Sequence, residues 1–156
     1  MIASERLDLR PGAPATYEIA FDDRASLAAA LGVRVPDSWP VDHYDADVLA
    51  QLRASTNGDT LYYVVERATN TLIGTFGSFK VDDETQMIGY SVLPEFRRRG
   101  FATEALRAFI AQSRVPRLVA YTFPHLVASI GVLEKCGFRR AGDGAEEGTI
   151  RFERLC

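Results

Sequence analysis

The chain has 156 residues, of which 47% are hydrophobic and 25% are charged; this suits a single globular domain with its own core. The formal net charge of −3 argues against broad nucleic-acid binding, and the apolar runs are too short to cross a bilayer. The two cysteines, Cys136 and Cys156, lack metal or disulfide spacing, and the charged N-terminal segment is unlike a signal peptide. We therefore expect a cytoplasmic protein with no metal, membrane or nucleic-acid partner.

The first part of the chain predicts a strand and then a helix. Residues 5–10 alternate polar and apolar side chains, and Pro11 and Pro14 end the strand. Residues 17–31 are rich in alanine and leucine and predict a helix. Gly32 is placed where a helix C-cap is expected.

The next segment, VRVPDSWPV at 33–41, contains two prolines and cannot form a regular element. It carries Trp39, the only tryptophan, which either pins the loop to the core or lines a ligand cleft. Residues 42–55 then predict a second helix, with Asp42 as a possible N-cap.

Two strands follow, at 60–68 and 72–79, joined by a turn. Gly74 and Gly77 lie inside the second strand. Glycine there predicts a bend or a close approach of two backbones.

The most informative stretch is residues 86–112, which predicts a strand, a break and a helix in that order. The strand at 87–93 ends at Pro94, and Arg97-Arg98-Arg99-Gly100 opens a segment with apolar residues at helical spacing. This order brings unpaired N–H groups and the positive end of a helix to one point, which favours an anion site.

The C-terminal third predicts a strand at 117–123, a short helix at 126–136 that stops at Gly137, and a final strand at 149–155. Together the elements predict an α/β fold, more closely an α+β mixed sheet with helices on both faces.

Charge is concentrated around the predicted anion site. Between residues 95 and 117 there are six arginines and two glutamates, so this segment carries +4 and the remainder −7. One basic centre in an acidic protein favours a single anionic ligand. The alternative is a solvated helix surface with salt bridges.

The sequence IGYSVLPEFRRRGFATEAL resembles the acetyl-CoA-binding motif of the GNAT family of N-acetyltransferases, and ASIGVLEKCGF resembles the helix and turn that follow in that family. The segments ERLDLRP and VPDSWP resemble the branch related to ribosomal-protein N-terminal acetyltransferases. The resemblance covers nearly the whole chain in element order. It implies a central, mostly antiparallel sheet that is splayed at the fourth and fifth strands.

The resemblance also implies where acetyl-CoA binds. The pantetheine arm is expected in the gap between residues 88–93 and residues 118–122, against backbone groups of Val92 and Leu93. The diphosphate is expected on the turn and first helical residues: Arg97, Arg98, Arg99, Gly100, Phe101, Ala102 and Thr103.

For catalysis, Ser129 matches the family's helix serine and is our candidate for contacting the leaving thiolate; the alternative is a serine that bonds to the helix backbone. Met87 stands where many relatives carry a glutamate base, and Leu126 stands where many carry asparagine. Several other groups could replace the base or donate a proton: Asp42, His43, Asp45, Asp83, Glu84, Tyr90, Tyr121 and His125.

We therefore expect an acetyl-CoA-dependent N-acetyltransferase acting on a small-molecule amine or a peptide N-terminus. Trp39 and Tyr44 are the candidates for lining the acceptor cleft. Two alternatives stay open: an acetyl-CoA-binding sensor that has lost catalysis, and an interaction module with a basic face. Neither the acceptor nor the oligomeric state follows from the sequence.

Overall fold

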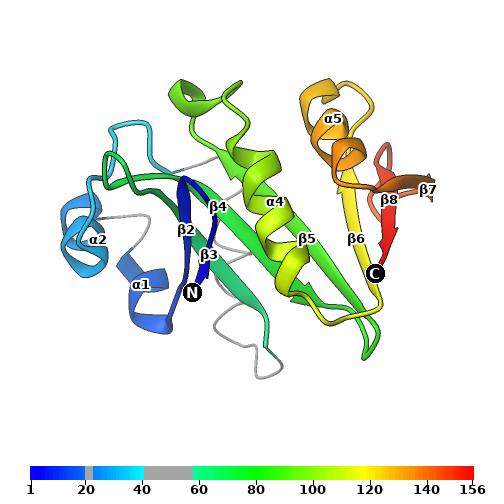
Figure 1. The fold of residues 1–156 in the computed structure, drawn as a ribbon, viewed down its shortest axis with the longest axis horizontal. Coiled ribbons are helices and arrows are strands. Elements are labelled where there is room, and N and C mark those ends of the chain that lie inside the picture. Colours follow the sequence, from blue (N-terminus) through cyan, green and yellow to red (C-terminus); the bar gives the residue numbers. More distant parts are fainter. Residues whose placement is uncertain (20–22, 41–57) are drawn as a thin grey trace.

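The computed structural model describes residues 1–19, 23–40 and 58–156, and within them the strands form one sheet. The strand order is β1-β2-β3-β4-β5-β6-β8-β7 (Figure 1). All described neighbours pair antiparallel except β5 and β6, which confirms the expected mostly antiparallel mixed sheet. The strands are β1 (Ile2–Ala3), β2 (Leu7–Pro11), β3 (Thr60–Glu66), β4 (Thr71–Lys80), β5 (Thr85–Val92), β6 (Arg117–Thr122), β7 (Arg139–Asp143) and β8 (Ile150–Leu155).

The helices in the described residues are α1 (Pro14–Ile19), α2 (Arg24–Leu31), α4 (Phe101–Gln112) and α5 (Val127–Lys135), with a 3₁₀ turn, η1, at Pro94–Phe96. The predicted helix at 42–55 lies outside the described residues. None of the described helices has the length and apolar character that crossing a membrane requires.

The single helix predicted at 17–31 is wrong, because this part of the chain forms both α1 and α2. Asp23 is the N-cap of α2, and its carboxylate accepts hydrogen bonds from the Ser26 N–H at 2.9 Å and hydroxyl at 2.5 Å. Pro14 opens α1 rather than only ending the strand before it, as suits proline in the first turn of a helix. The predicted C-cap at Gly32 is confirmed, with a left-handed φ of 67°.

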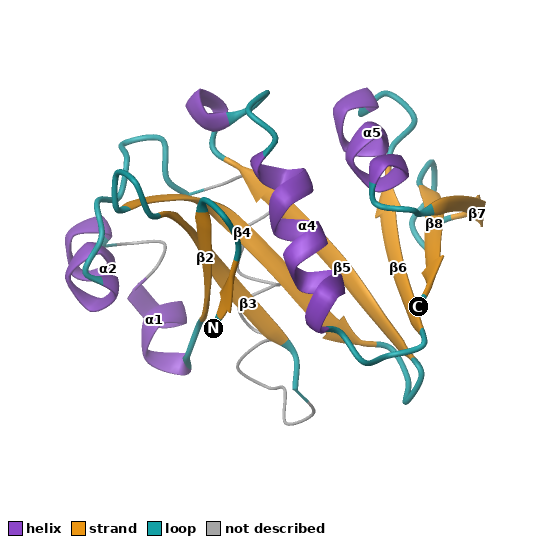
Figure 2. Ribbon diagram, viewed as in Figure 1, coloured by secondary structure: helices purple, strands orange, loops and turns teal. Residues whose placement is uncertain are grey.

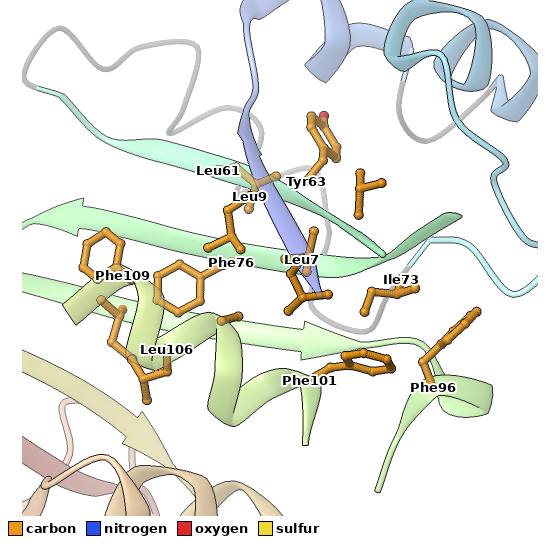
Figure 3. Close-up of a cluster of buried hydrophobic side chains, with 14 of the residues drawn as sticks. Leu7, Leu9, Leu61, Tyr63, Ile73, Phe76, Phe96, Phe101, Leu106 and Phe109 are labelled. Atoms are coloured by element: carbon orange, nitrogen blue, oxygen red, sulfur yellow. The ribbon is translucent and has the colours of Figure 1, made fainter. Parts of the chain in front are cut away.

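Side chains alternate between the two faces of the sheet, and α4 covers one of them (Figure 2). On this face Phe76 packs against Phe109 of α4 (Figure 3). The ring centroid of Phe76 lies 5.0 Å from that of Phe109 and 6.5 Å from that of Tyr62. On the other face Tyr63 packs against Trp39 at 6.1 Å. The core therefore lies on both sides of β3 and β4, which holds these strands rigidly beside β5.

The glycine at position 74 allows β4 and β5 to approach closely. A Cβ atom built on Gly74 would lie 2.2 Å from the carbonyl oxygen of Ser91. No real side chain tolerates that distance to a backbone atom, so the predicted close backbone approach is confirmed. It fixes the position of β5, the strand that leads into the arginine turn.

Candidate active site

Strands β5 and β6 pair over only three residues and then separate. The parallel pairs are Thr85 with Arg117, Gln86 with Leu118, and Met87 with Val119. Beyond Met87 the two strands diverge towards η1 and α5 (Figure 1). The predicted splay between residues 88–93 and residues 118–122 is confirmed.

Alternate backbone groups of β5 point into this gap. The Leu93 N–H donates to the Ile73 carbonyl on β4 at 2.8 Å, so residues 89 and 91 also direct their N–H groups towards β4. The N–H groups of Tyr90 and Val92 consequently point the other way, towards β6. In the splayed region β6 does not pair with them.

This alternation corrects the sequence-based choice of Leu93. Its N–H is bonded to Ile73, its carbonyl accepts the Phe96 N–H at 2.9 Å, and its side chain is fully buried. Leu93 therefore anchors the start of the turn and does not present its amide to the gap. Tyr90, together with Val92, takes that place.

The arginine turn, residues 97–100, joins β5 to α4 and contains two residues with left-handed backbone conformation. Arg98 has φ 65° and Gly100 has φ 78°, and Gly100 is the N-cap of α4. No described side chain caps this helix. The first N–H groups of a helix have no partner within it, so those of α4 face outward with the positive end of the helix dipole.

Side chains from the turn and from the N-terminus hold the loop in shape. Arg97 Nε donates to the Val92 carbonyl at 2.9 Å, and Arg6 Nη2 donates to the Arg99 carbonyl at 3.0 Å. The Arg99 guanidinium lies 5.4 Å from the centroid of the Phe96 ring. All three arginines are exposed, but these contacts give Arg97 and Arg99 a role in shaping the loop.

Glu104, in the first turn of α4, ties the N-terminal segment to this loop. Its carboxylate accepts hydrogen bonds from the Ser4 hydroxyl at 2.5 Å, the Arg6 N–H at 2.8 Å and Arg6 Nε at 2.7 Å. Burial raises the pKa of Glu104, but the hydrogen bonds from Ser4 and Arg6 outweigh it, so the pKa lies below its ordinary value. The ionised carboxylate also suits the positive end of the helix.

A cavity of about 330 Å³ occupies the gap between β5 and β6. Its walls come from both faces of the sheet, because Tyr90 and Ser129 lie on the α4 side and Thr75 and Ser91 on the other. The cavity thus passes through the sheet where the strands separate. Its lining residues are Leu61, Thr75, Gly77, Phe79, Ile88, Gly89, Tyr90, Ser91, Ala120, Tyr121, Thr122, Phe123, Leu126, Ser129, Leu133, Glu146 and Thr149.

The candidate Ser129 lies in this cavity and is linked to Tyr90. The Tyr90 hydroxyl lies 3.4 Å from Ser129 Oγ and donates to the Ser129 carbonyl oxygen at 3.2 Å. Burial raises the pKa of Tyr90 to about 12, although the hydrogen bond from Ser129 opposes this. At neutral pH the phenol therefore keeps its proton and can donate it to a hydrogen bond.

Of the other candidates from the sequence, some line the cavity and others lie outside it. Tyr121 lines the cavity, and so does Leu126 in the position of the family's asparagine. Asp83 pairs with Lys80 at 3.0 Å, and it lies with Glu84 in the turn between β4 and β5, outside the cavity lining. His125 is exposed and stacks on Phe123 at 5.6 Å.

Trp39 is only 3% exposed and belongs to the core, so its assignment to the acceptor cleft is corrected: the loop is pinned, as the alternative reading held. Four further candidates lie outside the described residues: Asp42, His43, Tyr44 and Asp45.

The structure adds Glu146, which sequence reasoning did not select. Its carboxylate-bearing side chain comes from the loop between β7 and β8, and it is the one acidic residue that lines the cavity among the described residues. In the sequence, residues 143–148 look like a loose acidic loop. Only the pairing of β8 with β6, with Thr122 opposite Ile150, brings it back to the gap.

A sheet that splays beside an uncapped helix N-terminus is the arrangement expected of an enzyme that uses an acyl-CoA. The family model of the acetyltransferase (GNAT) domain matches residues 6–139, and the chain belongs to this family. It is an N-acetyltransferase, and its acetyl donor is acetyl-CoA. A comparison with curated protein sequences finds no significant match.

Solved structures of low sequence identity share the fold. A GNAT-family acetyltransferase from Bacillus anthracis superposes with a TM-score of 0.68 at 22% identity, over 99% of this chain and 97% of that one. The ribosomal-protein alpha-N-acetyltransferase RimL, in complex with coenzyme A, gives 0.64 at 18% identity over 97% and 95%. A spermidine N-acetyltransferase SpeG chimera from Vibrio cholerae and hSSAT gives 0.62 at 17% over 97% and 96%.

The residues present fit acetyl-CoA. Gly100 leaves space at the N-terminus of α4, since a Cβ there would meet nothing closer than Arg6 Nη2 at 3.6 Å. The gap beside β5 offers N–H groups that β6 does not pair with. The donor set thus combines an anion cradle with an open strand edge, which suits a diphosphate followed by an amide-containing arm.

Proposed function

We propose that this chain transfers the acetyl group of acetyl-CoA directly to a primary amine, and that the splayed gap is where the transfer occurs. The observation that carries this is that β5 stops pairing with β6 at Met87, although β5 continues to Val92 and into the arginine turn. Acetyl-CoA supplies an activated thioester; the acetyl carbon bonds to the amine nitrogen as its bond to sulfur breaks.

On the donor side, the N–H groups of residues 98–103 would hold the diphosphate, with Gly100 allowing close approach and the exposed Arg98 adding charge. The N–H groups of Tyr90 and Val92 would pair with the arm and polarise the thioester carbonyl. Ser129 would donate a hydrogen bond to the sulfur as negative charge develops there.

On the acceptor side, a neutral amine is needed, so its proton must be accepted by a base or by water. The family's usual glutamate position holds Met87. Glu146 is the acidic residue among the described residues that line the cavity, and we assign its carboxylate the role of binding the acceptor ammonium and receiving its proton.

The residues that line the cavity favour a particular class of acceptor. The cavity lining includes the acidic residue Glu146 together with Tyr121 and Phe123, which suits a cationic amine on an apolar stem. Spermidine and a ribosomal-protein N-terminus are the acceptors named for two structural neighbours, and both belong to this chemical class.

Calorimetric titration with acetyl-CoA, followed by a transfer assay on a panel of polyamines and peptide N-termini, tests the proposal. We expect saturable binding and release of free CoA with at least one acceptor. Absence of binding at millimolar acetyl-CoA would overturn the proposed site. Binding without transfer to any amine would favour the non-catalytic alternative.

A further inference from the structure

One hydrogen-bonded pair joins the two walls of the gap. Tyr90 comes from β5 and Ser129 from α5, and their hydroxyl oxygens lie 3.4 Å apart. The Tyr90 hydroxyl also lies 3.2 Å from the Ser129 carbonyl oxygen. Both residues line the cavity, so the pair lies within reach of a group bound there.

The core fixes the position of the Tyr90 ring. The ring stacks on Phe76 with centroids 6.3 Å apart and an interplanar angle of 16°. Phe76 is fully buried and packs in turn against Phe109 of α4. The phenolic oxygen is therefore held by a strand that packs on the aromatic core rather than by a loop.

The phenol has one hydrogen and two acceptors within reach, which gives two arrangements. In the first, Tyr90 donates to the Ser129 carbonyl and the seryl hydroxyl donates to the Tyr90 oxygen. In the second, Tyr90 donates to Ser129 Oγ, which frees the seryl hydrogen to point into the cavity. Only the second arrangement offers the hydroxyl hydrogen of Ser129 to a bound group.

We propose that Tyr90 is a positioning residue that directs the Ser129 hydroxyl hydrogen towards the sulfur leaving group, so that the two hydroxyls act as one unit. This inference rests on the proposed function. Developing charge on sulfur favours the second arrangement, because the hydrogen bond from Ser129 becomes charge-assisted. Tyr90 strengthens it by donating to the same oxygen.

Tyr90 acts here without giving up its proton. Its pKa of about 12 makes the phenol a far weaker acid than a thiol, whose reference value is about 8.5. Protonation of the thiolate by Tyr90 is therefore unfavourable. The pair stabilises the thiolate through hydrogen bonds, and solvent protonates CoA after it leaves.

The test is a double-mutant cycle with Tyr90→Phe and Ser129→Ala, in which phenylalanine keeps the stacking on Phe76. Tyr62→Phe is the matched control, because Tyr62 belongs to the same aromatic cluster but lies on β3. We expect each single substitution to lower kcat at least tenfold while acceptor KM is unchanged. The double variant should be no slower than Ser129→Ala, and Tyr62→Phe should match the wild type.

A binding measurement gives a readout independent of turnover. The affinity of CoA divided by that of desulfo-CoA, which lacks the thiol, reports the contact with sulfur. We expect this ratio to fall to the same value in Tyr90→Phe, Ser129→Ala and the double variant. A ratio unchanged in Tyr90→Phe, or effects that multiply in the double variant, would overturn the inference.

These experiments distinguish failure of the Tyr90 positioning role from failure of the proposed function. If wild-type protein binds acetyl-CoA and transfers acetyl groups while Tyr90→Phe behaves like the wild type, only the positioning role is lost. If wild-type protein does not bind acetyl-CoA, both fail.

Discussion

Gly100→Ala tests the proposed diphosphate site, because its effect on acetyl-CoA binding can be measured apart from its effect on stability. Gly100 has φ 78°, and the new methyl group would lie 3.6 Å from Arg6 Nη2, which is an ordinary contact. The protein alone thus bears only the strain of a non-glycine residue in the left-handed region, about 1–2 kcal/mol. For a chain of this size that lowers Tm by about 2–8 °C.

Gly32→Ala is the matched control, because Gly32 has φ 67° and nothing within 4 Å of its Cβ position. It caps α2, away from the arginine turn, and should cost the same strain. Both variants should therefore lose similar Tm without ligand. Only Gly100→Ala should also weaken acetyl-CoA binding, because its methyl group occupies the anion cradle.

The ligand-induced shift in Tm measures this difference. At a ligand concentration of 100 Kd, binding stabilises the native state by about 2.7 kcal/mol, or about 5–11 °C. If Gly100→Ala weakens binding tenfold, the same concentration gives about 1.4 kcal/mol, and the shift halves. Equal shifts in Gly100→Ala and Gly32→Ala would refute the placement of the diphosphate on this turn.

Three further predictions follow from named contacts. Gly74→Ala should lower the free energy of unfolding in urea by about 1–3 kcal/mol, because its Cβ would meet the Ser91 carbonyl oxygen at 2.2 Å. Gly89→Ala is the control and should cost well under this, because nothing lies within 4 Å of its Cβ position. Equal costs would contradict the close approach of β4 and β5. Glu104→Gln should cost about 1–2 kcal/mol at pH 7. The folded-state pKa of Glu104 is depressed, so the ionised carboxylate stabilises the native state above the unfolded pKa of about 4.3, and this stabilisation is lost as pH falls through the folded pKa. The free energies of unfolding at pH 7 and pH 3 should therefore differ less in the variant than in the wild type. Glu146→Gln should lower kcat/KM for the amine at least tenfold with acetyl-CoA affinity unchanged; transfer at the wild-type rate would exclude Glu146 as the acceptor-side carboxylate.

The sequence predicted the elements whose patterns are local. The run at 87–93 and its proline break placed β5 and the turn within two residues, because an apolar strand and a proline stop are properties of a few consecutive side chains. Gly137 was likewise predicted as a helix stop, and it has φ 86°. The family resemblance then supplied the splay, which no local pattern contains.

What the sequence did not predict depends on distant parts of the chain. Strand β7 has no buried residue and shows no alternation, so only its pairing with β8 makes it a strand. The Leu93 amide faces β4 and not the gap because of the register between β4 and β5. Glu146 lines the cavity only because β8 returns to pair with β6.

Amide hydrogen exchange on β5, with and without acetyl-CoA, tests the central claim most directly. The N–H groups of Gly89 and Ser91 face β4 and should be protected in both states, while those of Tyr90 and Val92 face the gap and should gain protection only with the ligand. This alternation is the result that the account predicts. Acetyl-CoA binding that leaves Tyr90 and Val92 unprotected would contradict the placement of the cofactor arm between β5 and β6.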